Sequence, residues 1–140
     1  MSHYDLYAIG NALVDSEYEV SDQQLQTMGV DKRHMTLIDA ARRNELLKYL
    51  SGAKARRSGG GSAGNTVVAL SQLGGQAFYS CRVADDELGA FYKQDLQTNG
   101  VATNLTHSQA TEGQTGSCMV LVTPDAERSM CTFLGATSQL

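Results

Sequence analysis

Residues 58–65 read Ser58-Gly59-Gly60-Gly61-Ser62-Ala63-Gly64-Asn65, and an apolar, helix-like stretch, Thr66–Leu73, follows without a polar spacer. Glycine-rich composition alone would favour a flexible linker. Glycines that lead straight into a helix, however, expose the N–H groups of its first turn and let a ligand approach closely. We therefore interpret residues 58–65 as a ligand-binding loop. It is not a P-loop, because no Gly-Lys-Ser/Thr follows the glycines. Nor is it the dinucleotide-binding fingerprint, because Gly59, Gly61 and Gly64 do not follow a clear first strand.

A second polar segment, Gly10-Asn11-Ala12-Leu13-Val14-Asp15, follows the short apolar run Tyr4–Ile9, which is typical of a buried strand. An Asn or Asp after a glycine is often only a turn residue. At the end of a first parallel strand, however, such side chains lie where open α/β sheets bind ligands. Asp15 can accept hydrogen bonds from two neighbouring sugar hydroxyls, and Asn65 can both donate and accept. From the residues alone, the turn and the binding site both stay open.

Strand and helix patterns alternate on either side of the glycine run. The patterns predict a helix over Asp39–Leu50, a strand over Ala77–Val83, and a helix that Asp85-Asp86-Glu87 opens and Asn99-Gly100 closes. The alternation from Ala55 to Val101 predicts an α/β fold with a mainly parallel sheet and crossover helices.

Four further β-prone stretches do not fit this alternation. They cover residues 17–20, 35–38, 117–123 and 128–134, and the last two flank a turn at Pro124-Asp125-Ala126-Glu127. We expect these strands to form a small accessory sheet.

Composition narrows the function classes. The chain has 140 residues, about one ordinary domain, with 41% apolar and 19% charged residues. Its net charge of −4 argues against a nucleic-acid partner. No apolar run is long enough to cross a membrane, and the start Met1-Ser2-His3-Tyr4-Asp5 lacks the basic residues of a signal peptide. We expect a cytoplasmic protein without a membrane partner.

The cysteines argue against a disulfide framework. Cys81, Cys118 and Cys131 are odd in number and lie in apolar runs, so we expect reduced core thiols. No cysteine pair has zinc-ligand spacing and the histidines are scattered, so no metal site is expected in these residues.

Four motifs together resemble the ribokinase-like (PfkB) kinases. Residues 10–15, 60–65, 85–89 and 99–101 occur in the order and spacing of that family, and the resemblance covers essentially the whole chain. It implies a ribokinase-like α/β fold, of which residues 1–140 would be the N-terminal part of one domain.

Further details are similar to the adenosine kinase branch of this family. They are the presence of both Asn11 and Asp15, and the stretch Thr115-Gly116-Ser117-Cys118. The sequence departs from the family pattern at two positions, Val67 where a small residue is common and Ala84 where a glycine is usual. Neither position supplies a binding side chain in the family, so these departures affect only the assignment to a subfamily.

The resemblance also implies roles for individual residues. Asp15 and Asn65 would bind sugar hydroxyls, Gly60 and Gly61 would give the sugar room against the backbone, and Asn11 would help to hold the substrate. The strands at 17–20, 35–38, 117–123 and 128–134 would form a lid that excludes water from the substrate. The lid also offers a surface through which two copies could pair as a homodimer.

The implied activity is transfer of a phosphoryl group from ATP, with Mg²⁺, to a hydroxyl of a sugar or nucleoside. The family's catalytic base lies in a Gly-Ala-Gly-Asp motif that these 140 residues lack, so we expect the base and the ATP site downstream and no turnover by this chain alone. The main alternative is a non-catalytic sugar-binding or interaction module. A dehydrogenase or redox domain is disfavoured because the glycines of residues 59–64 do not follow a clear first strand and because C-x-x-C is absent from the sequence.

Overall fold

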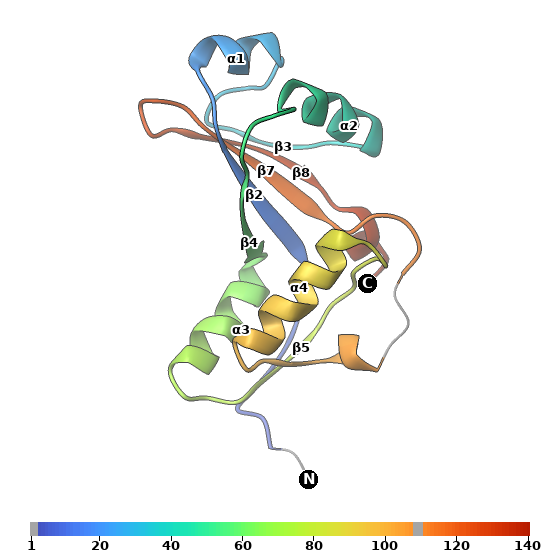
Figure 1. Cartoon of the computed structure of the whole chain (residues 1–140). Helices are drawn as coiled ribbons and strands as arrows, with labels where there is room; N and C mark the ends of the chain where they lie inside the picture. The colour runs from blue at the N-terminus through green and yellow to red at the C-terminus, as the bar shows by residue number, and fades with distance from the viewer. Residues whose placement is uncertain (1–2, 108–110) are drawn as a thin grey trace. The chain divides into compact units, whose positions relative to one another are not determined.

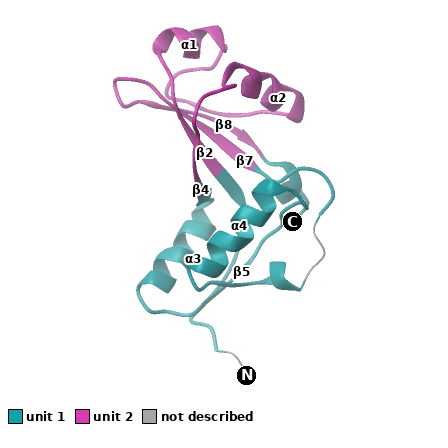
Figure 2. Cartoon of the chain, in the orientation of Figure 1, with its two compact units in different colours: residues 1–14, 58–116, 134–140 teal, residues 15–57, 117–133 magenta. Residues whose placement is uncertain are grey.

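The computed structural model describes residues 3–107 and 111–140, which form two compact units (Figure 2). Unit 1 comprises the described residues within 1–14, 58–116 and 134–140, and unit 2 comprises residues 15–57 and 117–133. The chain therefore passes between the units after residues 14, 57, 116 and 133.

Unit 1 contains a parallel sheet with the strand order β1-β5-β6. Its elements are β1 (Leu6–Ile9), α3 (Ser62–Gln72), β5 (Ala77–Ser80), α4 (Glu87–Thr98), β6 (Ala102–Thr103) and the 3-10 helices η1 (Asn104–Thr106) and η2 (Gly135–Gln139). Helix α3, strand β5 and helix α4 follow one another along the chain (Figure 1), and β6 comes after α4. The predicted parallel sheet with crossover helices is thus confirmed.

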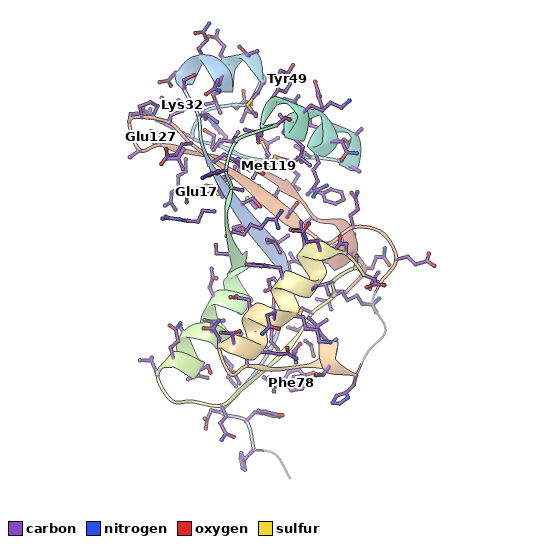
Figure 3. The ribbon with its side chains drawn as sticks, in the orientation of Figure 1. Glu17, Lys32, Tyr49, Phe78, Met119 and Glu127 are labelled. Carbon is purple, nitrogen blue, oxygen red and sulfur yellow. The ribbon has the colours of Figure 1, made fainter. Side chains whose placement is uncertain are left out.

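One face of this sheet forms the core of unit 1. Tyr79 of β5 and Val67 of α3 are fully buried, and Tyr92 of α4 is 2% exposed. On the opposite face, Phe78 (labelled in Figure 3) stacks on Tyr7 of β1, with the ring centroids 5.1 Å apart. The alternation along β5 therefore separates a covered face from an open one.

Unit 2 is built on a second sheet with the order β3-β8-β7-β2-β4. Its elements are β2 (Leu13–Glu19), α1 (Asp22–Thr27), β3 (Met35–Leu37), α2 (Ala40–Tyr49), β4 (Arg56–Gly60), β7 (Ser117–Val122) and β8 (Arg128–Phe133), and β2 and β4 each continue into unit 1. Strands β7 and β8 form an antiparallel hairpin, whereas β3 pairs with β8 in parallel. The expected accessory strands therefore occur in one sheet, together with β4, which was not expected.

Helices α1 and α2 contribute to the core of unit 2. Leu25 of α1 and Leu46 of α2 pack in one buried cluster with Met119 of β7, which Figure 3 labels, and Cys131 of β8. At the hairpin turn, Lys32 (Figure 3) forms ion pairs with Asp22 (2.7 Å) and Asp125 (2.6 Å).

The cysteines are buried, free thiols, as the sequence predicted. Burial raises the pKa of Cys81 to about 12, so its thiol stays protonated at neutral pH. Within residues 3–107 and 111–140, no helix combines the length and apolar character that a membrane span requires.

Candidate functional site

The predicted glycine loop is much shorter than the sequence suggested. Strand β4 ends at Gly60 and helix α3 begins at Ser62, which leaves Gly61 as the single connecting residue. Gly61 has φ 91°, and a Cβ at this position would collide with the carbonyl oxygen of Asn11. A glycine is therefore required both by the backbone conformation and by the close approach of the Gly10–Asp15 segment. The expectation of a loop over 58–65 was wrong, because β2 pairs with residues 56–60 and extends them into a strand.

The first turn of α3 presents backbone N–H donors at this same point. Helix α3 has no side-chain cap, so the N–H groups at its start have no capping partner there. The backbone N–H of Asn65 already bonds to the Gly61 carbonyl (2.9 Å), and the Asn65 side chain is exposed. The turn thus brings an amide side chain and the backbone N–H groups of the first helical turn to one end of the helix, an arrangement suited to polar ligands.

The backbone of Asn11 is fixed by a buried tyrosine. The hydroxyl of Tyr79 donates a hydrogen bond to the Asn11 carbonyl over 3.1 Å. Burial raises the pKa of Tyr79 to about 12, so it remains a donor at neutral pH. The Asn11 side chain itself is exposed.

A second buried tyrosine supports the glycine turn. The hydroxyl of Tyr92 donates to the Gly60 carbonyl over 2.9 Å, and burial raises the pKa of Tyr92. A Cβ on Gly64 would lie 2.5 Å from this hydroxyl, so Gly64 makes room for it. Sequence reasoning missed this role, because Tyr92 fits the apolar stripe of a helix and nothing in that pattern shows where its hydroxyl points.

The Asp85-Asp86-Glu87-Leu88-Gly89 motif has a structural role in unit 1. The Asp86 side chain caps α4 by accepting a hydrogen bond from the backbone N–H of Gly89 (2.8 Å). It also accepts from the backbone N–H of Thr115, and the Thr115 hydroxyl accepts in turn from Ala84 N–H (2.9 Å). This motif therefore joins the start of α4 to the segment that leads into β7.

Asp15 belongs to unit 2 and lies within strand β2, not in a loop after β1 as the sequence suggested. The expected loop position of Asp15 was wrong, because β2 pairs with β7 and β4 and this pairing extends the strand back to Leu13. The binding role of Asp15 stays a prediction. The Asp15 side chain is half-buried, and burial raises its pKa. A carboxylate in such a position gains from a ligand that donates hydrogen bonds to it, since those bonds favour the charged form.

Among the predicted site residues, Asn11, Gly60, Gly61 and Asn65 lie in unit 1, where the turn at Gly61 links them. Asp15 is described with unit 2. In the part of the chain that the structure describes, no group of three or more His, Cys, Asp or Glu residues is placed to hold a metal ion.

Comparisons with known proteins identify the family. Residues 30–140 match the pfkB family carbohydrate kinases. The fold matches the crystal structure of adenosine kinase from Sinorhizobium meliloti with 40% identity and a TM-score of 0.83 over 99% of this chain. A probable sugar kinase from Rhizobium etli CFN 42 is 39% identical over the whole chain, with a TM-score of 0.82. Mouse (Mus musculus) ribokinase is 29% identical over 77 residues, which are 55% of this chain.

These relatives are longer than the chain. It spans 42% of the length of each of the two solved kinases and 24% of the mouse ribokinase. The ribokinase-like α/β fold predicted from the sequence is confirmed by these matches.

Proposed function

The chain belongs to the pfkB family of carbohydrate kinases, and we propose that the whole protein transfers the γ-phosphoryl group of ATP to a hydroxyl of a sugar or nucleoside. The observation that best supports this is the packing of Gly61 against the Asn11 carbonyl. It brings two exposed amide side chains, Asn11 and Asn65, to one turn, in which Gly60 and Gly61 carry no Cβ. Such a turn suits a flat, hydroxyl-rich ligand that approaches the backbone closely.

We assign the substrate contacts as follows. Asn65 and Asp15 bind sugar hydroxyls, Gly60 and Gly61 admit the sugar ring, and Asn11 holds the substrate by its amide. A half-buried carboxylate such as Asp15 forms charge-assisted hydrogen bonds, which are shorter and stronger than neutral ones.

An adenosine-like nucleoside is the substrate that we favour. The presence of both Asn11 and Asp15 and the Thr115–Cys118 stretch support this choice, as does the 40% identity to an adenosine kinase. The family implies ATP as phosphoryl donor, with Mg²⁺. Because the described residues form no metal-binding cluster, we derive no role for them toward the metal ion.

We also propose that strands β2, β3, β7 and β8 act as a lid over the substrate. Strand β3 lies at the end of its sheet, and its Met35 and Leu37 side chains are 56% and 62% exposed. An apolar edge strand of this kind favours pairing with another copy. We therefore propose that the lid supports a homodimer, which sedimentation measurements on the whole protein would detect.

The test of the proposed activity is an ADP-release assay on the whole protein with ATP, Mg²⁺ and either adenosine or D-ribose. We expect turnover, with adenosine preferred. Calorimetric binding of the same two compounds separates the alternatives. Binding without ADP release would indicate a non-catalytic sugar-binding module, and neither binding nor release would contradict the substrate class.

A further inference from the structure

Thr137 lies behind the Asn11 side chain. It belongs to η2 and is 1% exposed. Its hydroxyl oxygen accepts a hydrogen bond from the backbone N–H of Ala12 (3.0 Å) and lies 3.3 Å from Oδ1 of Asn11. Among the described residues, this hydroxyl is the group within hydrogen-bonding distance of the Asn11 side chain.

The single proton of this hydroxyl determines how the Asn11 amide is oriented. The Ala12 N–H is a donor and occupies a lone pair of the hydroxyl, so the Thr137 proton is available for Asn11 Oδ1. If the Asn11 amide were flipped, its Nδ2–H₂ group and the Ala12 N–H would both donate to the Thr137 hydroxyl oxygen. The hydroxyl proton of Thr137 would then have lost its acceptor, Asn11 Oδ1. A buried unsatisfied donor is unfavourable, so the network selects the orientation with Oδ1 toward Thr137.

The rest of Asn11 has little freedom. Its carbonyl accepts from the Tyr79 hydroxyl, and Gly61 packs against the same carbonyl oxygen. Only the side-chain torsions remain, and the Thr137 hydroxyl restrains them. With Oδ1 bound to a buried residue, the Nδ2–H₂ group faces the exposed side.

We propose that Thr137 is a positioning residue that fixes the Asn11 amide with its Nδ2–H₂ group toward the substrate. Asn11 then recognises its ligand as a hydrogen-bond donor. The substrate atom that it contacts must offer a lone pair, such as a hydroxyl or ring oxygen of the sugar. This inference rests on the proposed function, in which Asn11 contacts the substrate, and it specifies the chemistry of that contact.

A double-mutant cycle in the whole protein tests the coupling, with adenosine as the probe. Thr137→Val keeps the shape but removes the hydroxyl, and we expect KM to rise roughly three- to tenfold with kcat nearly unchanged. Thr137→Ser restores the hydroxyl and should recover most of the loss. In an Asn11→Ala background, Thr137→Val should change KM by less than about twofold, because the residue through which it acts is gone.

Two results would overturn the proposal. One is an equal effect of Thr137→Val with and without the Asn11 side chain, which would show that Thr137 acts through its bond to the Ala12 N–H or through packing and not through the Asn11 amide. The other is Thr137→Ser behaving like Thr137→Val, which would assign the effect to the methyl group.

A neutron crystal structure of the whole protein provides a readout that does not depend on activity. We expect a deuterium between Thr137 Oγ1 and Asn11 Oδ1, with the amide deuterons on the far side. If this orientation is found but the protein phosphorylates neither adenosine nor D-ribose, the proposed function fails and the donor orientation stands. Amide deuterons directed at Thr137 would refute the inference whatever the activity.

Discussion

Asp86 accepts two hydrogen bonds from Thr115, one from its backbone N–H (2.8 Å) and one from its hydroxyl (2.5 Å). With the Gly89 N–H bond, one carboxylate serves three donors from two segments of unit 1. The acidic motif at 85–89 thus has a clear structural purpose, whatever substrate the protein binds.

The first prediction concerns this carboxylate. In Asp86→Asn, an NH₂ group replaces one carboxylate oxygen. At least one of the N–H and O–H groups of Gly89 and Thr115 that donate to this carboxylate then loses its acceptor. We expect a loss of about 1–3 kcal/mol in the free energy of unfolding, measured by urea denaturation of the whole protein. Asp85→Asn, at the exposed neighbouring position, is the matched control and should change stability little. Equal effects of the two substitutions would contradict the capping role.

The second prediction isolates the close contact at Gly61. Gly61 and Gly74 have nearly the same φ, 91° and 92°, but a Cβ at Gly74 meets nothing within 4 Å. Gly74→Ala should therefore lower the free energy of unfolding by about 1–2 kcal/mol, through backbone strain alone. Gly61→Ala adds the collision with the Asn11 carbonyl, and we expect a clearly larger loss together with weaker adenosine binding. Thermal unfolding and calorimetry measure the two effects, and matching losses at both sites would refute the close contact.

The third prediction concerns the pH dependence of stability. Burial raises the pKa of Asp15 above its ordinary value of 3.8, so folding disfavours the charged carboxylate. Above pH 3.8 the Asp15 carboxyl is ionised in the unfolded chain, and ionising it in the folded protein costs free energy because it is half-buried. The charged carboxylate therefore lowers the free energy of unfolding at neutral pH, and this destabilisation disappears as the pH falls toward 3.8. Asp15→Asn should thus raise the Tm of the ligand-free protein at pH 7, and the gain should shrink on acidification. Glu19→Gln, at an exposed position of the same strand, removes one negative charge without changing a half-buried site and is the control for the loss of charge alone.

The fourth prediction concerns the effect of Asp15→Asn on function. The substitution keeps the shape of the side chain but removes its charge and one acceptor oxygen. We expect kcat/KM for adenosine to fall by roughly one to two decades. The KM for ATP should barely change. Asn65→Ala should act in the same direction. If Asp15→Asn leaves adenosine kinetics within about twofold of the parent, Asp15 is not the sugar anchor.

The fifth prediction concerns the buried tyrosine behind Asn11. Tyr79→Phe removes the donor to the Asn11 carbonyl, and we expect a loss of about 1 kcal/mol in unfolding free energy with an increased KM for adenosine. Since the pKa of Tyr79 is raised to about 12, the parent activity should show no alkaline decline due to Tyr79 ionisation between pH 8 and about 11. Tyr7→Phe, which alters an exposed tyrosine of the same sheet, is the control for the kinetic effect. A KM unchanged by Tyr79→Phe would show that this bond does not shape the site.

Local signals predicted much of the fold. The acidic residues 85–87 and the Asn99-Gly100 pair correctly predicted the two ends of α4. Asp86 caps the start of this helix, and Gly100, with φ 73°, lies just after its end. The turn at 124–127 likewise marked the β7–β8 hairpin, in which Ala126 N–H bonds to the Thr123 carbonyl. In both cases the signal lies within a few residues of the structure that it determines.

The missed features depend on more distant partners or on short motifs. Strand β4 has a strand-poor sequence and exists because it pairs with β2. Helix α1 is only six residues long, and its one readable signal is the capping box formed by Ser21 and Gln24. The bonds that Tyr79 and Thr137 make to the 10–15 segment cannot be read from sequence, because a hydroxyl gives no indication of its partner.

The order in which the chain folds follows from its four passages between the units. Unit 1 combines residues near both ends of the sequence, and the Ala12–Thr137 hydrogen bond joins positions 125 apart. Loops of this length close slowly, and domains rich in such distant contacts fold slowly. We therefore expect the Asn11 segment to reach its final packing only after residues 134–140 have been synthesised. Until then we expect Ala12 and Val14, which are fully buried in the folded unit, to remain accessible to solvent.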